Sequence, residues 1–495
     1  MRIDRATVKL GFPSPGSIPP MAQLMTTGGD ARIRLNPGTW LNRYHSGPYP
    51  RDVIAFASST ANDLSSDAMA QLEREFACGG ASLTDGVVYA SFLDSIRARL
   101  RSAYALRQDV DIFIAASGTD LEYIGMLAAP VSDNGLGNLL LGSDEVGSGC
   151  VWSAAGCYFA DQTALAKPST QGKKIAGLPL VYLDNLALRD ETGTALNSAY
   201  IANRIAEHIE FALAARRRPL IHIVHGSKTG LVLPHFQEID ALIGRFGDTV
   251  TFVVDACQGR ITSAAISAYL ARGIIVFLTG SKFIGGPPFG GFALLPANCA
   301  AFAPPLASGM TDIFRQAEVP LGWSGRETLQ DDGNPGLALR LAASLFELER
   351  FQALELQDIA RVVSAFGEAT DQLIHRLDIS RVANVAPGDS DGSAVHPVEK
   401  TLITLGLSHD KRGFQHRWLD FDDAVRIHKR LIDAGIRLGQ PVRSVKLTDG
   451  RWGATLRIAL SMPQIQKLHA LPDDGLAAAL QSDFDRIGSL LLPLL

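Results

Sequence analysis

The chain has 495 residues, 46% of them hydrophobic and 20% charged, which is the composition of a globular protein large enough for two or more domains. Its net charge of −5 and its lack of a long basic run argue against a nucleic-acid partner, and no apolar run is long enough to cross a membrane. Five cysteines without a CxxC pair, and a start without the apolar core of a signal peptide, predict reduced thiols and a cytoplasmic protein.

The first 60 residues are rich in proline and glycine, so we expect an N-terminal arm that lies across another part of the molecule. Tyr44 and His45 stand in this arm with Asn42 and Arg51, and any of the four could reach a neighbouring site. An ordinary surface loop is the more frequent outcome for any one such residue. Apolar residues at helical spacing then predict helices at 65–80 and 91–106.

Residues 109–130 read as a strand, a glycine turn and a helix, with Ser117, Gly118 and Thr119 at the helix N-terminus. Free backbone N–H groups, the helix dipole and two hydroxyls suit a phosphate at that place. A plain helix cap made by serine or threonine would give the same pattern, and for the turn alone the cap is the favoured interpretation because strand–SGT–helix is a common arrangement.

Strands and helices then alternate, which predicts a parallel, doubly wound sheet. Strands are expected at the start of 138–156, at 178–184 and at the start of 219–247, and helices at 197–218 and at the end of 219–247. Neither GxGxxG nor GxxxxGK[ST] occurs in these turns, so a nucleotide-binding protein is disfavoured.

Residues 251–296 hold the most informative pair. An apolar run ends at Asp255, and a second apolar run ends in Thr279, Gly280, Ser281 and Lys282. Both side chains would lie at the carboxyl ends of neighbouring strands, where open α/β sheets bind ligands. A lysine there can form a Schiff base with the aldehyde of pyridoxal phosphate (PLP), and an aspartate can hold its pyridine nitrogen protonated. Taken alone, this pair favours the ordinary interpretation, a strand-end aspartate and a solvated lysine.

The last third follows a different pattern. A polar, glycine-rich loop at 322–336 precedes a long helix at 337–377, and strands at 400–407, 441–447 and 454–461 alternate with helices in a small α/β unit. We therefore expect an arm at 1–60, a large domain at 61–320, an interface loop with bridging helices at 321–378 and a small domain at 379–495.

Four motifs, HGSKTGLVLP, VVDACQG, LTGSKFIGGPPFGG and LRIALS, occur in an order and at spacings that resemble the fold-type-I PLP-dependent enzymes. The resemblance is strongest to the group of class V aminotransferases and cysteine desulfurases. It implies the aspartate aminotransferase fold, that is, a mainly parallel, seven-stranded, doubly wound sheet with a smaller C-terminal α/β domain. It also implies PLP as cofactor, an amino acid as substrate and a homodimer.

The resemblance also implies roles for single residues. Lys282 matches the Schiff-base lysine and Asp255 the partner of the pyridine nitrogen. Arg457 matches the arginine that binds the substrate α-carboxylate, although a buried structural salt bridge would account for an arginine in an apolar strand too. The remaining matches concern the cofactor: Gly118, Thr119 and Thr279 at its phosphate, Gln258 and Ser227 at its phenolic oxygen, and Ser281 where desulfurases have a histidine.

Two positions depart from the family pattern. Glu145 or Val146 falls where these enzymes place the ring that stacks on the cofactor, with Trp152 and Tyr158 nearby in sequence. No cysteine follows Cys299, whereas desulfurases need a mobile cysteine in the C-terminal half, so persulfide chemistry is disfavoured. Cys257 is expected to pack in the core, on the opposite side from Asp255.

Some candidates remain. His225 ends a predicted strand and faces the expected cleft, so it is a candidate for contact with cofactor or substrate. Arg326 and Thr328 lie in a loop that reaches the partner subunit in this family. No histidine has the spacing of a metal ligand, so we predict no metal.

The predicted activity is chemistry at the α-carbon of an amino acid, with Lys282 as the base once the substrate amine has displaced it. A class V aminotransferase is the first choice, by analogy with the family. A PLP-dependent lyase that eliminates a β or γ substituent is the alternative, and a non-catalytic protein on the same fold is a third possibility.

Overall fold

The computed structural model describes residues 18–76, 80–130, 132–147, 149–297, 299–389, 395–408 and 418–495. The first 17 residues of the predicted arm and Cys78 therefore lie outside the described residues. No helix in the described ranges is both long enough and apolar enough to span a bilayer.

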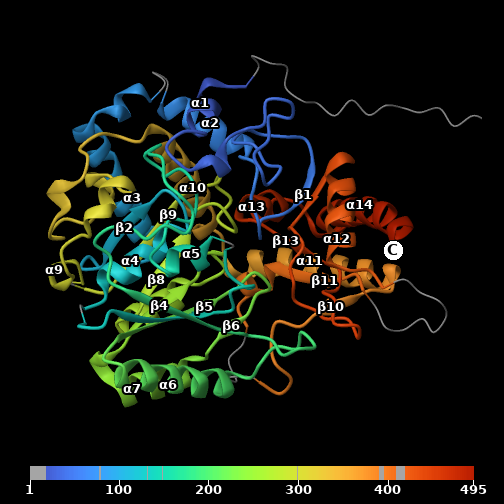
Figure 1. Ribbon diagram of the computed structural model, residues 1–495. Helices are drawn as coiled ribbons and strands as arrows, with labels where there is room; N and C mark the ends of the chain where they lie inside the picture. The colour runs from blue at the N-terminus through green and yellow to red at the C-terminus, as the bar shows by residue number, and fades with distance from the viewer. Residues whose placement is uncertain are drawn as a thin grey trace, which may run out of the picture.

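A mainly parallel sheet forms the centre of the larger part of the molecule (Figure 1). The predicted seven strands are confirmed, and a two-residue strand, β6 (Val232–Leu233), pairs antiparallel with one of them. Among the seven main strands in the described part of the chain, only β9 (Gly291–Leu295) runs antiparallel to its neighbours. Across the sheet the order is β2 (Asp111–Ala115), β9 (Gly291–Leu295), β8 (Ile275–Thr279), β7 (Thr251–Asp255), β5 (Arg218–His225), β3 (Leu136–Leu141) and β4 (Val181–Leu186).

Helices cover both faces of this sheet, which explains why its central strands are mostly apolar. Neighbouring residues of β7 point to opposite faces: Val253 packs with α4 (Leu121–Ala128), and Val254 packs with the helices of the other face. Figure 1 shows two of these, α6 and α7, side by side along the sheet. The helices of the second face are α3 (Gly86–Ala103), α6 (Ser198–Ala214), α7 (Phe236–Phe246) and α8 (Ser263–Ala271).

The C-terminal part carries its own antiparallel sheet, in the order β10 (Ser380–Val382), β11 (Leu402–Gly406) and β13 (Thr455–Ala459). A strand of the predicted arm, β1 (Ile54–Phe56), pairs in parallel with β12 (Ile436–Leu438), so the arm is bound to the C-terminal part. The helices here are α11 (Leu356–Leu377), α12 (Phe421–Asp433), α13 (Met462–His469) and α14 (Asp473–Leu491). The remaining helices are α1 (Pro20–Leu24), α2 (Ser66–Glu75), α5 (Cys150–Ala154), α9 (Cys299–Phe302) and α10 (Pro335–Gln352).

Two predicted elements differ from the structure. The single helix at 337–377 is two helices, because the chain leaves α10 at Ala353 and Glu355 is extended where α11 begins. The strand predicted at 441–447 is absent, and only Lys446 there makes an isolated bridge. Pro441 has no N–H to donate, and the backbone of Val442 bonds to the Thr455 hydroxyl, so side-chain bonds replace a strand ladder.

Candidate active site

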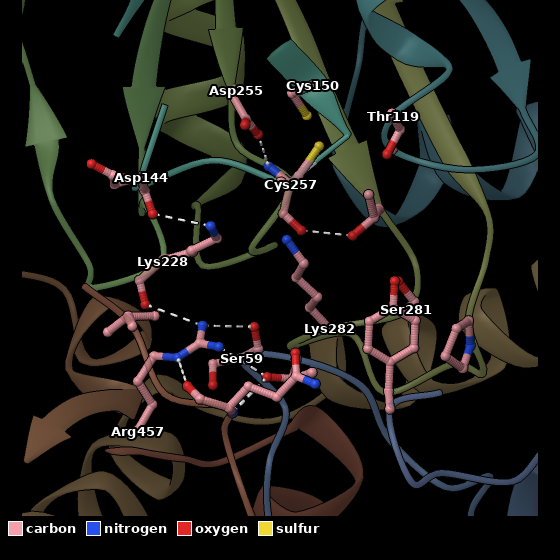
Figure 2. A pocket seen from close by; sticks show the side chains of 18 of the residues that line it. Ser59, Thr119, Asp144, Cys150, Lys228, Asp255, Cys257, Ser281, Lys282 and Arg457 are labelled. Carbon is pink, nitrogen blue, oxygen red and sulfur yellow. Dashed lines mark hydrogen bonds between the residues drawn. The ribbon is translucent and has the colours of Figure 1, made fainter. Parts of the chain in front are cut away.

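A cavity of about 540 Å³ lies at the carboxyl ends of β2, β5, β7 and β8. The predicted arm and the C-terminal part close it from the other side, with Thr60 and Gln440 among the lining residues. Figure 2 shows this cavity from close by. Eight residues predicted from the sequence line it: Tyr44, Gly118, Thr119, Asp255, Thr279, Ser281, Lys282 and Arg457.

Asp255 and Lys282 lie in this one cavity because their strands, β7 and β8, are neighbours in parallel register. Asp255 is the last residue of β7, and its Oδ1 accepts a hydrogen bond from the Cys257 N–H at 2.8 Å. The backbone at Lys282 is held by Asn62, whose Nδ2 donates to the carbonyls of Ser281 at 3.0 Å and Lys282 at 2.6 Å. The Lys282 side chain is thereby free to extend into the cavity, as Figure 2 shows.

The turn between β2 and α4 forms another wall. Gly118 lets it approach β8 closely, because a Cβ added there would lie only 2.7 Å from Cγ2 of Thr279. The Thr279 hydroxyl donates to the Cys257 carbonyl at 2.6 Å, and the Ser117 hydroxyl donates to Asp120 at 2.6 Å. The turn therefore places the Thr119 hydroxyl and a helix N-terminus at the cavity wall.

Arg32 reaches this turn from the arm and is a cavity residue that sequence reasoning missed. Its guanidinium pairs with Asp30 at 2.7 Å and donates to the hydroxyls of Thr119 at 3.1 Å and Ser117 at 3.3 Å. The ring of Phe289 lies 4.6 Å from its central carbon. The sequence gives no clear signal for Arg32, because other charged residues such as Arg34 and Arg43 stand in the same arm.

Arg457 lies in the middle of β13 and is only 3% exposed. Its Nε donates to the Gln440 carbonyl at 3.0 Å, Nη1 to the carbonyls of Ser59 at 3.1 Å and Lys228 at 3.4 Å, and Nη2 to the Thr60 hydroxyl at 3.0 Å. Burial lowers its pKa to about 10, so it stays charged at neutral pH. Within the described part of the chain it has no carboxylate partner, which leaves a buried cation beside the cavity.

Lys228 is a second cavity lysine that sequence reasoning passed over, although it stands inside the quoted HGSKTG motif. Its Nζ donates to the Asp144 carbonyl at 3.0 Å. Burial, together with the nearby charge of Arg457, lowers its pKa to about 8. The cavity thus holds two lysine side chains, and Figure 2 shows both.

Glu145, Ser227 and Gln258 were predicted to bind the cofactor, but none of them lines the cavity. The side chain of each bonds to another residue of the protein instead. Glu145 pairs with Arg189 at 2.9 Å and accepts a hydrogen bond from the Ser227 hydroxyl at 2.8 Å, so these two predicted residues bind each other. The Gln258 Oε1 accepts from Arg260 at 2.8 Å.

Both histidine candidates also lie outside this cavity. The ring of His225 is buried against Tyr269, with Nδ1 3.1 Å from the phenolic oxygen, and burial lowers its pKa to about 4. His45 lines a separate cavity of about 1230 Å³ together with Arg51 and Lys429.

The loop expected to supply a stacking ring contributes Gly147, Cys150 and Val151 to the cavity instead. Val146 is buried in the core, and neither Trp152 nor Tyr158 is a lining residue. Rings enter from elsewhere, as Tyr44 and Phe289 both line the cavity with an edge contact of 5.8 Å between ring centres.

The structure also shows the surroundings of Cys257. Cys257 is buried in a hydrophobic cluster, as expected, but it also lines the cavity next to Asp255. Burial and the Asp255 charge raise the pKa of its thiol well above the usual value.

Arg326 donates to the Val319 carbonyl and Thr328 to the Gly325 carbonyl, and neither lines the cavity. No group of three or more metal-binding side chains forms among the described residues.

Comparison with known proteins gives a result only at the level of structure. No protein-family model matches the sequence, and a search of curated proteins finds no match. A cysteine desulfurase from Thermococcus onnurineus NA1, solved in its apo form, is similar over 89% of this chain and 94% of its own, with 14% identity and a TM-score of 0.54. This chain has the aspartate aminotransferase fold.

Two further solved structures support the same fold. A serine palmitoyltransferase from Sphingomonas wittichii is similar over 89% of this chain and 89% of its own, with 13% identity and a TM-score of 0.51. A NifS-like protein from Rickettsia africae ESF-5 is similar over 90% of this chain and 99% of its own, with 13% identity and a TM-score of 0.51. The fold expected from the four sequence motifs is therefore confirmed.

Proposed function

We propose that this protein is a PLP-dependent enzyme that acts at the α-carbon of an amino acid, most simply as an aminotransferase of the class V type. The observation that carries the proposal is the meeting of Asp255 and Lys282 in one cavity at the carboxyl edge of the sheet. A lysine amine and a carboxylate in this arrangement are the two groups that a PLP site requires.

The cavity fits the cofactor in three further respects. The turn at Gly118 and Thr119, at the N-terminus of α4, presents N–H groups, a hydroxyl and the Arg32 guanidinium, which together suit a phosphate dianion. Asp255 would hold the pyridine nitrogen, and Lys282 would bind the aldehyde. Arg457, a buried cation without a carboxylate partner among the described residues, suits a substrate carboxylate.

When bound, PLP supplies an aldehyde that condenses with amines and a ring that withdraws electrons from the substrate α-carbon. The residues of this chain supply the rest. Arg457 holds the substrate carboxylate and fixes which bond at the α-carbon faces the catalytic groups. Lys282, once displaced by the substrate amine, accepts the α-proton on Nζ. The Asp255 carboxylate keeps a proton on the pyridine nitrogen.

The proposal also covers the oligomeric state, the cellular location and the division into domains. We propose a homodimer, because sites of the enzyme group that the sequence resembles are shared between two subunits. We propose a cytoplasmic location, which is supported by the four described cysteines, all of them free thiols. The division into an arm at 1–60, a large domain at 61–320, an interface loop with bridging helices at 321–378 and a small domain at 379–495 is likewise proposed.

The test begins with the absorbance of the purified protein after PLP has been added. We expect a visible band that borohydride removes, and we expect Lys282→Ala to lack it. A panel of amino acids then identifies the reaction, since an aminotransferase releases a keto acid and leaves the cofactor in its amine form. Release of ammonia with return of the original band would favour the lyase instead. A colourless protein after addition of PLP would rule out both.

A further inference from the structure

One side of the proposed cofactor site is left without the residues that the sequence assigns to it. Ser227 and Gln258 were expected to contact the phenolic oxygen of PLP. The Ser227 hydroxyl donates to Glu145, and the Gln258 side chain accepts from Arg260 and donates to the Ser59 carbonyl at 3.3 Å. Neither of them lines the cavity, so that oxygen lacks the two contacts that the sequence assigns to it.

Lys228 is the residue that reaches the cavity from the same loop. It follows Ser227 directly in the loop after β5, and its Nζ has one hydrogen bond, to the Asp144 carbonyl at 3.0 Å. Among the described residues, no carboxylate pairs with this ammonium group. An ammonium group has three donors, so at least one N–H remains available to a ligand.

The order of the strands fixes on which side Lys228 lies. Along the carboxyl edge of the sheet the order is β2, β9, β8, β7 and β5. Thr119 follows β2 at one end, and Lys228 follows β5 at the other. Lys282 and Asp255 come from β8 and β7, between these two. Figure 2 shows the same arrangement, with Thr119 and Lys228 on opposite sides of Lys282.

The chemical structure of PLP has the matching order. Its aldehyde carbon stands between the phosphate-bearing arm on one side and the 3-hydroxyl on the other, and the pyridine nitrogen lies opposite the aldehyde. With the phosphate at Thr119, the aldehyde at Lys282 and the nitrogen at Asp255, the 3-hydroxyl faces the β5 side. We propose that the Lys228 ammonium group donates a hydrogen bond to this oxygen. The inference rests on the proposed function and adds a cofactor-binding residue to it.

A cation at this oxygen has a measurable consequence. It stabilises the deprotonated oxygen and opposes a further proton on the bound cofactor, because like charges repel. Lys228→Met removes the charge and keeps the length of the side chain. We therefore expect the pKa read from the visible band of bound PLP to rise by about one to two pH units in Lys228→Met. Lys228→Arg, which keeps the charge, should move this pKa by less than half as much as Lys228→Met does.

The experiment is a pH titration of that band in the wild-type holoprotein, the two Lys228 variants and Lys167→Met. Lys167→Met is the control for the loss of a lysine charge away from the site, because the Lys167 ammonium donates to the Thr311 carbonyl at 2.7 Å and pairs with Asp312 at 3.1 Å, outside the cavity. A wild-type protein without a borohydride-sensitive band overturns both the proposed function and this inference. A normal band whose pKa is unchanged in Lys228→Met overturns this inference alone. An unchanged pKa with weaker binding of acidic amino acids also overturns it and assigns Lys228 to the substrate side chain.

Discussion

Replacing Arg457 by methionine should remove recognition of the substrate carboxylate while leaving recognition of its amine. The guanidinium has five N–H groups, and the structure uses four of them, on Gln440, Ser59, Lys228 and Thr60. One N–H on Nη2 remains for a ligand. A hydrogen bond between charged groups contributes about 1.5 to 3 kcal/mol, which corresponds to about 10- to 150-fold in affinity.

The assay compares an amino acid with its decarboxylated amine, each titrated into the PLP-loaded protein and followed by absorbance. The wild type should bind the amino acid about 10- to 150-fold more tightly than the amine, and Arg457→Met should bind the two alike. This ratio is insensitive to general damage to the site. Arg437→Met is the control for the loss of a buried arginine, because Arg437 is also buried and donates to the Ala61 carbonyl, yet it pairs with Asp63 and does not line the cavity. A preserved ratio in Arg457→Met would refute the assignment.

Three other changes test separate parts of the structure. Arg32→Met should raise the Kd of the apoprotein for PLP about 10- to 100-fold in a fluorescence titration, because a charged partner of the phosphate is lost; an unchanged Kd would contradict this. Glu145→Ala should lower the free energy of unfolding, measured by urea denaturation, by about 3 to 5 kcal/mol, because it leaves the buried Arg189 guanidinium without its carboxylate partner. A loss below about 1 kcal/mol would contradict this. Burial raises the pKa of Glu347 to about 7, above its unfolded value, so its charge destabilises the fold as pH rises through 7. Glu347→Gln should therefore gain about 2 to 3 kcal/mol of stability at pH 8 and much less at pH 5, and an equal gain at both would be inconsistent with this pKa.

The sheet could be predicted because its information is local. Runs such as 252–254 and 275–278 are apolar at every position, which indicates strands buried on both faces, and helices such as α7 and α11 have apolar residues at helical spacing. Strand order then follows from the family resemblance. One of the two errors arises from a distant partner: the Thr455 hydroxyl bonds to the backbone of Val442, in place of a strand at 441–447.

The residues of the candidate site also fall into two groups, those that the fold alone positions and those that depend on the orientation of a side chain. Asp255, Lys282 and Gly118 are at strand ends or in a tight turn, so the fold alone brings them together. Side chains such as Ser227 and Gln258 depend on their orientation, and each is turned away by a charged neighbour, Glu145 in the first case and Arg260 in the second. Arg260 in turn donates to the Ser58 hydroxyl, 202 positions away in sequence. No local pattern predicts such a pairing.

Arg32 and Lys228 were missed for opposite reasons. Arg32 comes from a segment without regular pattern, and only tertiary structure brings it 3.1 Å from the Thr119 hydroxyl, 87 positions away. Lys228 was visible inside a recognised motif, but the family match directed attention to its neighbour Ser227. The structure shows that Lys228 lies just after the end of β5 and lines the cavity, which makes it a candidate cofactor-binding residue.

The most direct test of the account is the site of covalent attachment. The PLP-loaded protein is reduced with borohydride and digested, and the peptide that carries the pyridoxyl mass is sequenced by mass spectrometry. The account predicts the label on Lys282. A label on Lys228, the other lysine in the cavity, or no label on any peptide would contradict it.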